Sequence, residues 1–136
     1  MRTNADITLY NRYNSSGIAS YNRTVIHDVA WESRKASNVL ASGGNIAADQ
    51  ANIYIPMQRG DSYQGPAAWR ALTIKGGRWT LQPGDLIVRG IVTEELSGAY
   101  TPTTLRKEYD NVLEITSVDL LDNGSANLSH WKVGAK

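Results

Sequence analysis

The stretch RWTLQPGDLIVRGIV, residues 78–92, holds the most apolar strand-like run of the chain and decides the fold class. Within it, Pro83 sets φ near about −65°, and Gly84 accepts the positive φ that a type II turn requires next. Residues 82–85 are therefore predicted to form a tight turn, and residues 86–92 the central β-strand that follows it. The pattern indicates a β-corner that carries no catalytic chemistry.

The aromatic composition also favours strands. The 136 residues include four Trp and seven Tyr but neither Phe nor Cys. Aromatic and β-branched side chains suit a pleated sheet, and a chain of this length buries roughly two-thirds of its unfolded surface as one domain. Without cysteine the chain has no disulfide, no zinc–thiolate site and no thiol nucleophile.

The charge is balanced, with 14 Lys and Arg against 13 Asp and Glu, a formal net charge of +1. This balance predicts neither nucleic-acid nor membrane binding. The N-terminal residues contain no apolar signal segment, and no run is long enough to span a membrane. We therefore expect a soluble, non-secreted protein with no membrane partner.

Short alternating runs separated by turn residues define the expected architecture. Two short helices are expected at residues 66–72 and 105–111, the second capped by Thr103 or Thr104. The expected fold is a single mainly β domain, residues 1–136: a small antiparallel β-barrel or sandwich of about six strands with one or two short helices. The expected strands are residues 6–10, 21–32, 50–57, 86–92, 112–121 and 128–133, with a turn at 122–125 before the last.

Alternation within residues 21–32 places Val25, His27, Val29 and Trp31 on one apolar face. A histidine at such a position is more often a half-buried, hydrogen-bonded residue than a ligand or a base. His27 is therefore expected to have a structural role.

Residues 33–49, SRKASNVLASGGNIAAD, differ from the rest of the chain in composition and in the absence of a clear period. Seventeen residues are long for a connection in a compact domain, where the median is ~4–6. The segment is expected to be a long projecting loop. It is either a mobile surface loop or an arm that closes like a hairpin on meeting a partner.

The chemical motifs of enzymes are missing from the sequence. It has no H-E-x-x-H, no G-x-S-x-G and no phosphate-binding glycine loop, and its only histidines are His27 and His130. The carboxylate pairs Glu94-Glu95 and Glu108/Asp110 are more typical of solvated faces. We expect no enzymatic activity, no catalytic, metal or cofactor-binding residues, and no cofactor.

Five stretches resemble a family of small phage and prophage virion proteins encoded among head and neck genes. They are NADITLYNRY, RTVIHDVAWE, IYIP, WTLQPGDLIVRG and SHWKVGAK, and they span nearly the whole chain. The family is assigned to head closure (stopper) or a closely related head–tail connector role. The resemblance implies a β-barrel that forms a homo-oligomeric ring between the portal–adaptor and the tail proteins, in a virion assembled in the bacterial cytoplasm.

In such proteins a long loop between early strands can project into the channel and help retain packaged DNA, with non-specific contact to it. The resemblance places residues 33–49 in that position. The interaction residues it implies are Arg34, Lys35, Ser37, Asn38, Val39, Leu40, Gly43 and Gly44.

Two alternatives remain open from the sequence. A tail terminator or another tail-proximal ring protein would have the same structural features. A single-stranded nucleic-acid-binding barrel would stack bases on strand aromatics in a basic groove, although the basic residues here are evenly spread among acidic ones.

Overall fold

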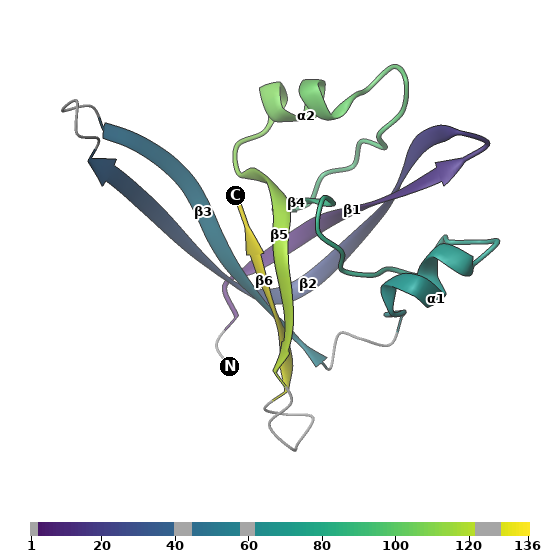
Figure 1. Cartoon of the computed structure of the whole chain (residues 1–136), viewed down its shortest axis with the longest axis horizontal. Helices are drawn as coiled ribbons and strands as arrows, with labels where there is room; N and C mark the ends of the chain where they lie inside the picture. Colours follow the sequence, from purple (N-terminus) through teal and green to yellow (C-terminus); the bar gives the residue numbers. More distant parts are fainter. Residues whose placement is uncertain (1–2, 40–44, 58–61, 122–128) are drawn as a thin grey trace.

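A computed structural model of the chain describes residues 3–39, 45–57, 62–121 and 129–136. These residues form six strands and two short helices (Figure 1). In chain order the elements are β1 (Ala5–Ser15), β2 (Ile18–Val39), β3 (Asn45–Pro56), α1 (Pro66–Ala71), β4 (Leu86–Arg89), α2 (Pro102–Glu108), β5 (Val112–Leu121) and β6 (His130–Ala135).

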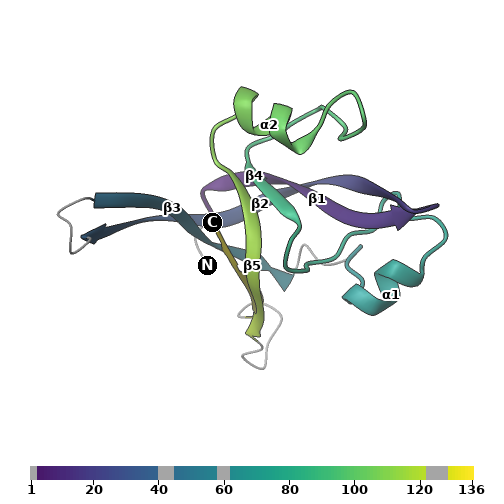
Figure 2. The same ribbon diagram turned by 45° about the horizontal axis from the view of Figure 1, so that its top comes forward.

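The strands close into a barrel in the order β1-β2-β3-β6-β5-β4, with β4 pairing back onto β1. Every neighbouring pair is antiparallel. The predicted mainly β fold with two short helices is confirmed, and its strands form a barrel. Figure 2 shows that β2 extends past the barrel at both ends, with the β1–β2 hairpin on one side and a β2–β3 ribbon on the other.

Tryptophan and tyrosine supply the aromatic side chains of a largely aliphatic barrel core, where other proteins use phenylalanine. All four tryptophans are buried, and Trp79 and Trp131 pack edge-to-face with ring centres 5.7 Å apart. Tyr63 lies against both rings, 5.1 Å from Trp79 and 4.7 Å from Trp131. Such aromatic pairs contribute about 0.5–1.5 kcal/mol each beyond the area they bury.

A second apolar cluster covers the outer face of β1 and β4 beneath α2. Its buried members are Tyr10, Leu86, Val88, Val92, Leu96, Leu105 and Val112. Because both faces of β4 are covered here, this strand is apolar without alternation. This explains why Leu86, Ile87 and Val88 are all buried.

The central corner forms as predicted, but its strand is shorter. Gly84 adopts a φ of 95° after Pro83, and the backbone N–H of Asp85 donates to Gln82 O at 3.3 Å. β4 then ends at Arg89 because Gly90, with a φ of 102°, turns the chain away. The expectation of a strand through residue 92 is wrong.

A β-bulge changes which side chains of β2 point toward the core. Ala5 pairs with Val29, whereas Ile7 pairs with Ile26, so β2 has one extra residue between these pairs. Asp28 takes a φ of 58° at this point, and Ile26 and Val29 both face the core. His27 is left with 60% of its side chain exposed, and its predicted place on the apolar face is wrong.

The ends of the later elements also differ from the sequence-based expectation. Thr101, rather than Thr103 or Thr104, caps α2, and its hydroxyl accepts the backbone N–H of Thr104 at 3.3 Å. β6 begins at His130. The turn predicted at residues 122–125 lies outside the described residues.

Candidate functional site: a projecting two-stranded ribbon

Residues 33–49 are largely strand, whereas the sequence predicted a long connecting loop. Residues 33–39 continue β2 and residues 45–51 begin β3, in a register that runs from Ser33↔Ala51 to Val39↔Asn45. We call these two paired segments the ribbon. A strand acquires an alternating pattern when one of its faces packs on a core. The ribbon extends beyond the barrel (Figure 1), so its sequence shows no period.

The structure places five of the eight predicted interaction residues along one strand of the ribbon. Residues 34, 35, 37, 38 and 39 lie on β2, where their backbones pair with residues 50, 49, 47, 46 and 45 of β3. Leu40, Gly43 and Gly44 lie outside the described residues. The five predicted residues that the structure describes therefore share one element.

Asn4 marks the base of the ribbon on its β1 side. Its backbone N–H donates to Val29 O at 2.9 Å, and its side-chain amide exchanges two hydrogen bonds with the backbone of Trp31, at 2.7 and 3.1 Å. The Asn4 side chain thus makes the two hydrogen bonds to the Trp31 backbone that a further residue of β1 would make through its own backbone. In the part of the chain that the structure describes, β2 has no partner on this side beyond Trp31.

The β3 edge of the ribbon also lacks a neighbouring strand among the described residues. Pairing between β3 and β6 begins at Ala51↔Ala135, so residues 45–50 of β3 pair with β2 alone among the described residues. Both outer edges of the ribbon therefore present backbone N–H and C=O groups that can pair with another strand. A two-stranded ribbon by itself is marginally stable in water. This arrangement favours association with a further chain.

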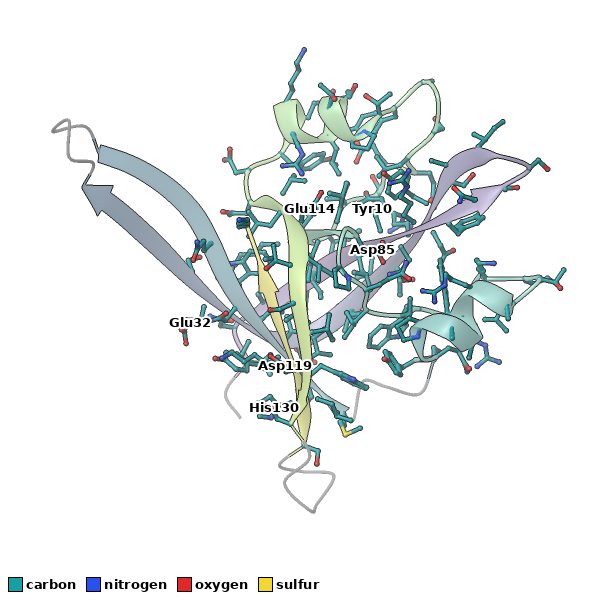
Figure 3. The ribbon with its side chains drawn as sticks, viewed as in Figure 1. Tyr10, Glu32, Asp85, Glu114, Asp119 and His130 are labelled. Atoms are coloured by element: carbon teal, nitrogen blue, oxygen red, sulfur yellow. The ribbon has the colours of Figure 1, made fainter. Side chains whose placement is uncertain are left out.

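A buried carboxyl group with a raised pKa lies elsewhere, at the corner before β4 (Figure 3). Asp85 is 2% exposed, and burial raises its pKa from 3.8 to about 6. Its two oxygens accept hydrogen bonds from Asn11 Nδ2 at 2.7 Å, the Arg12 backbone N–H at 3.0 Å and Gln82 Nε2 at 3.2 Å. With each oxygen engaged, this carboxylate joins the corner to β1 rather than facing a substrate.

Sequence reasoning missed this buried polar group, because an Asp after Pro-Gly is typical of an exposed turn. Its partner Asn11 is fully buried within a β-strand. A polar side chain that is buried in a strand usually has a hydrogen-bond partner. Asn11 was therefore the one available sequence signal for this buried polar group.

The two histidines have separate surroundings. His27 Nδ1 lies 3.5 Å from Asp6 Oδ1, and His130 packs edge-on against Tyr54 with ring centres 5.5 Å apart. Among the described residues, no group of three or more His, Asp or Glu side chains could hold a metal ion. No helix in this part of the chain is long and apolar enough to cross a membrane.

The glutamates expected on solvated faces help to attach α2 and the segment before it to the barrel. Glu94 accepts the Tyr10 hydroxyl at its backbone oxygen and the Tyr109 hydroxyl at Oε2, at 2.8 and 2.7 Å. The hydrogen bond to Glu94 raises the pKa of Tyr109, and burial raises that of Tyr10. Glu95 forms an ion pair with Arg23 at 3.2 Å.

Together these features define a class of mainly β, closed-barrel proteins with a projecting two-stranded ribbon. The chain belongs to a family of unknown function (DUF6751), whose sequence profile matches residues 2–136. Comparisons with curated proteins and with solved structures gave no significant match.

Proposed function

We propose that this chain is a structural, non-enzymatic virion protein of the phage head–tail connector. In this role it is a head-closure ring subunit that joins the portal–adaptor to the tail and helps to retain packaged DNA. Neighbouring subunits associate through the ribbon, and the ribbon tip serves as the gating element.

The open edges of the ribbon carry the proposal. Residues 34–39 and 45–50 pair only with each other within the described chain, and they continue strands anchored in the barrel. A ring neighbour that adds a strand to one edge would satisfy its backbone groups and order the ribbon. The whole-chain resemblance to virion neck proteins supports the same role.

The test replaces residues 37–47 with an Asn-Gly turn. Ala36 and Ala48 face each other in the ribbon, so a two-residue turn can close the shortened hairpin between them. We expect an unchanged thermal unfolding midpoint, because the described part of the removed segment, residues 37–39 and 45–47, lies beyond the barrel. Ring assembly, measured by light scattering after gel filtration, is expected to be lost. Particles that carry the deletion are expected to leak DNA or to lack tails.

The matched control shortens the opposite end of β2. Replacing residues 15–18 with Asn-Gly joins Asn14 to Ala19, which also face each other, and leaves the ribbon intact. This control is expected to assemble normally. Unfolding of the domain on ribbon deletion, or normal assembly without the ribbon, would contradict the proposal.

Position within the particle separates head closure from the tail-terminator alternative. A head-closure subunit lies directly below the portal–adaptor, and a terminator lies at the end of the tail tube. Electron microscopy of virions labelled on this protein measures that position, and label on isolated tails would favour the terminator.

A further inference from the structure

A basic hollow lies between the outer part of β1 and the segment around α1. Its volume is about 360 Å³, near the lower limit of the roughly 300–1,000 Å³ typical of ligand pockets. Three of its five lining side chains are cations and none is a carboxylate. The lining residues are Arg12, Tyr13, Asn14, Arg70 and Lys75.

Neutral groups hold the Lys75 ammonium in place. Its Nζ donates to Leu72 O at 2.6 Å and to Arg70 O at 3.5 Å. It also lies 4.9 Å from the ring centre of Tyr13 and 5.3 Å from that of Trp69. Carbonyl dipoles and aromatic faces orient an ammonium without neutralising it, so its positive charge remains available.

Gln82 connects the two arginines of the hollow. Arg70 Nη1 donates to Gln82 Oε1 at 3.1 Å, and Gln82 Nε2 donates to the backbone oxygen of Arg12 at 3.1 Å. The Arg12 backbone N–H also donates to Asp85. Arg12 and Arg70 are therefore anchored to the same corner, and both are exposed.

The positive charge of the hollow is only partly balanced. Asp85 is close enough for the Arg12 charge to lower its pKa, but this carboxylate is buried behind the hollow with both oxygens engaged. Arg12, Arg70 and Lys75 carry three formal positive charges, and Asp85 carries one negative charge. The net formal charge of these four side chains is therefore +2. The ion pairs found among the described residues are Arg23–Glu95 and His27–Asp6, and neither involves a cation of the hollow.

We propose that Arg12, Arg70 and Lys75 form a phosphate-binding site between β1 and α1. Guanidinium groups donate paired hydrogen bonds to phosphate oxygens, and lysine adds a compact positive charge. Phosphates of a nucleic-acid backbone and free phosphate share this chemistry. The site lies near α1, on the opposite side of the barrel from the ribbon (Figure 2), so it shares no residue with the ribbon.

The aromatic residues beside the site do not favour base recognition. Trp69 is fully buried, and Lys75 covers one face of the half-buried Tyr13 ring, so the site lacks the open aromatic platform on which bases stack. Binding should therefore be insensitive to sequence and weaken steeply with salt.

The experiment uses the full chain with three probes: inorganic phosphate, a short fluorescent DNA as single strand and duplex, and a poly-glutamate peptide. At constant ionic strength, phosphate is expected to shift the backbone amide NMR signals of Arg12, Tyr13, Asn14 and Arg70. DNA binding is followed by fluorescence anisotropy. Arg12→Gln and Arg70→Gln should each weaken it about tenfold and lower the salt slope by roughly 0.7–0.9.

Arg89→Gln is the matched control, because it removes the same charge from an exposed position on β4. It should change binding less than about twofold, as expected for an arginine without phosphate contacts. Shifts with phosphate but no DNA binding would support the site with free phosphate as its ligand. An equal effect of Arg89→Gln and Arg70→Gln, preference for poly-glutamate, or no response to any probe would overturn the proposal.

Discussion

Asn11 Nδ2 lies 2.7 Å from Asp85 Oδ2, although the two residues are 74 positions apart in the chain. The same amide group donates to Thr80 O at 2.8 Å, and Asn11 Oδ1 accepts the Thr80 backbone N–H at 3.1 Å. One buried side chain on β1 thus holds both arms of the corner that leads into β4. The corner depends on this residue for its position against the barrel.

Replacing Asn11 with alanine is therefore expected to destabilise the fold strongly. Asn11→Ala leaves the N–H and carbonyl of Thr80 and one oxygen of Asp85 without their partner, at a cost of about 2–4 kcal/mol in the free energy of unfolding. Urea titration measures this change. Asn22→Ala, which removes a single exposed hydrogen bond to Arg78 O, should cost less than about 1 kcal/mol. Equal losses in the two variants would contradict the role of Asn11.

The Asp85 carboxylate should make stability depend on pH. Its pKa rises from 3.8 to about 6 on folding, chiefly through burial and against the hydrogen bond from Asn11. Between these values the folded state holds a proton that the unfolded state has released. The free energy of unfolding should therefore fall as pH rises through this window.

Asp85→Asn provides the comparison, because the amide does not titrate. From about pH 4 to about pH 7, wild-type protein should lose ~2 kcal/mol of unfolding free energy relative to this variant. Urea titrations at several pH values measure both proteins. Parallel pH profiles would show that the carboxylate does not titrate in this range.

Thr101 should account for the capping of α2. Thr101→Ala removes the hydroxyl that accepts the Thr104 N–H and should cost about 1 kcal/mol of unfolding free energy. Thr103→Ala changes an exposed residue of the first turn and should fall within about ±0.5 kcal/mol. Thermal unfolding of both variants distinguishes the capping residue from its neighbour.

The β1–β2 turn offers a stabilising change. Ser16 and Gly17 have φ values of 52° and 80°, as in a type I′ turn, where Asn-Gly is strongly preferred. Ser16→Asn should raise the free energy of unfolding by roughly 0.5 kcal/mol, because asparagine tolerates positive φ better than serine. Gly17→Ala should lower it by about 1 kcal/mol or more at the same turn. A lower unfolding midpoint for Ser16→Asn would contradict this assignment.

Several elements were predictable because their signals are local. The turn at Pro83-Gly84 follows from the backbone preferences of its own residues, and residues 112–121 form β5 as expected. Alternation failed at His27 because the bulge depends on how β1 pairs with β2, which neither strand reveals alone. It also did not predict the ribbon, whose paired strands extend beyond the barrel (Figure 1).

The sequence by itself determined a mainly β fold with tryptophan and tyrosine in its core, since turn chemistry and apolar spacing act over a few neighbouring residues. Only the tertiary structure decided that the strands close into a barrel, that Asn11 meets Asp85, and that Arg12 approaches Arg70 and Lys75. These contacts join segments more than fifty residues apart. Which distant groups meet is set by strand order and register, and those are properties of the folded chain as a whole.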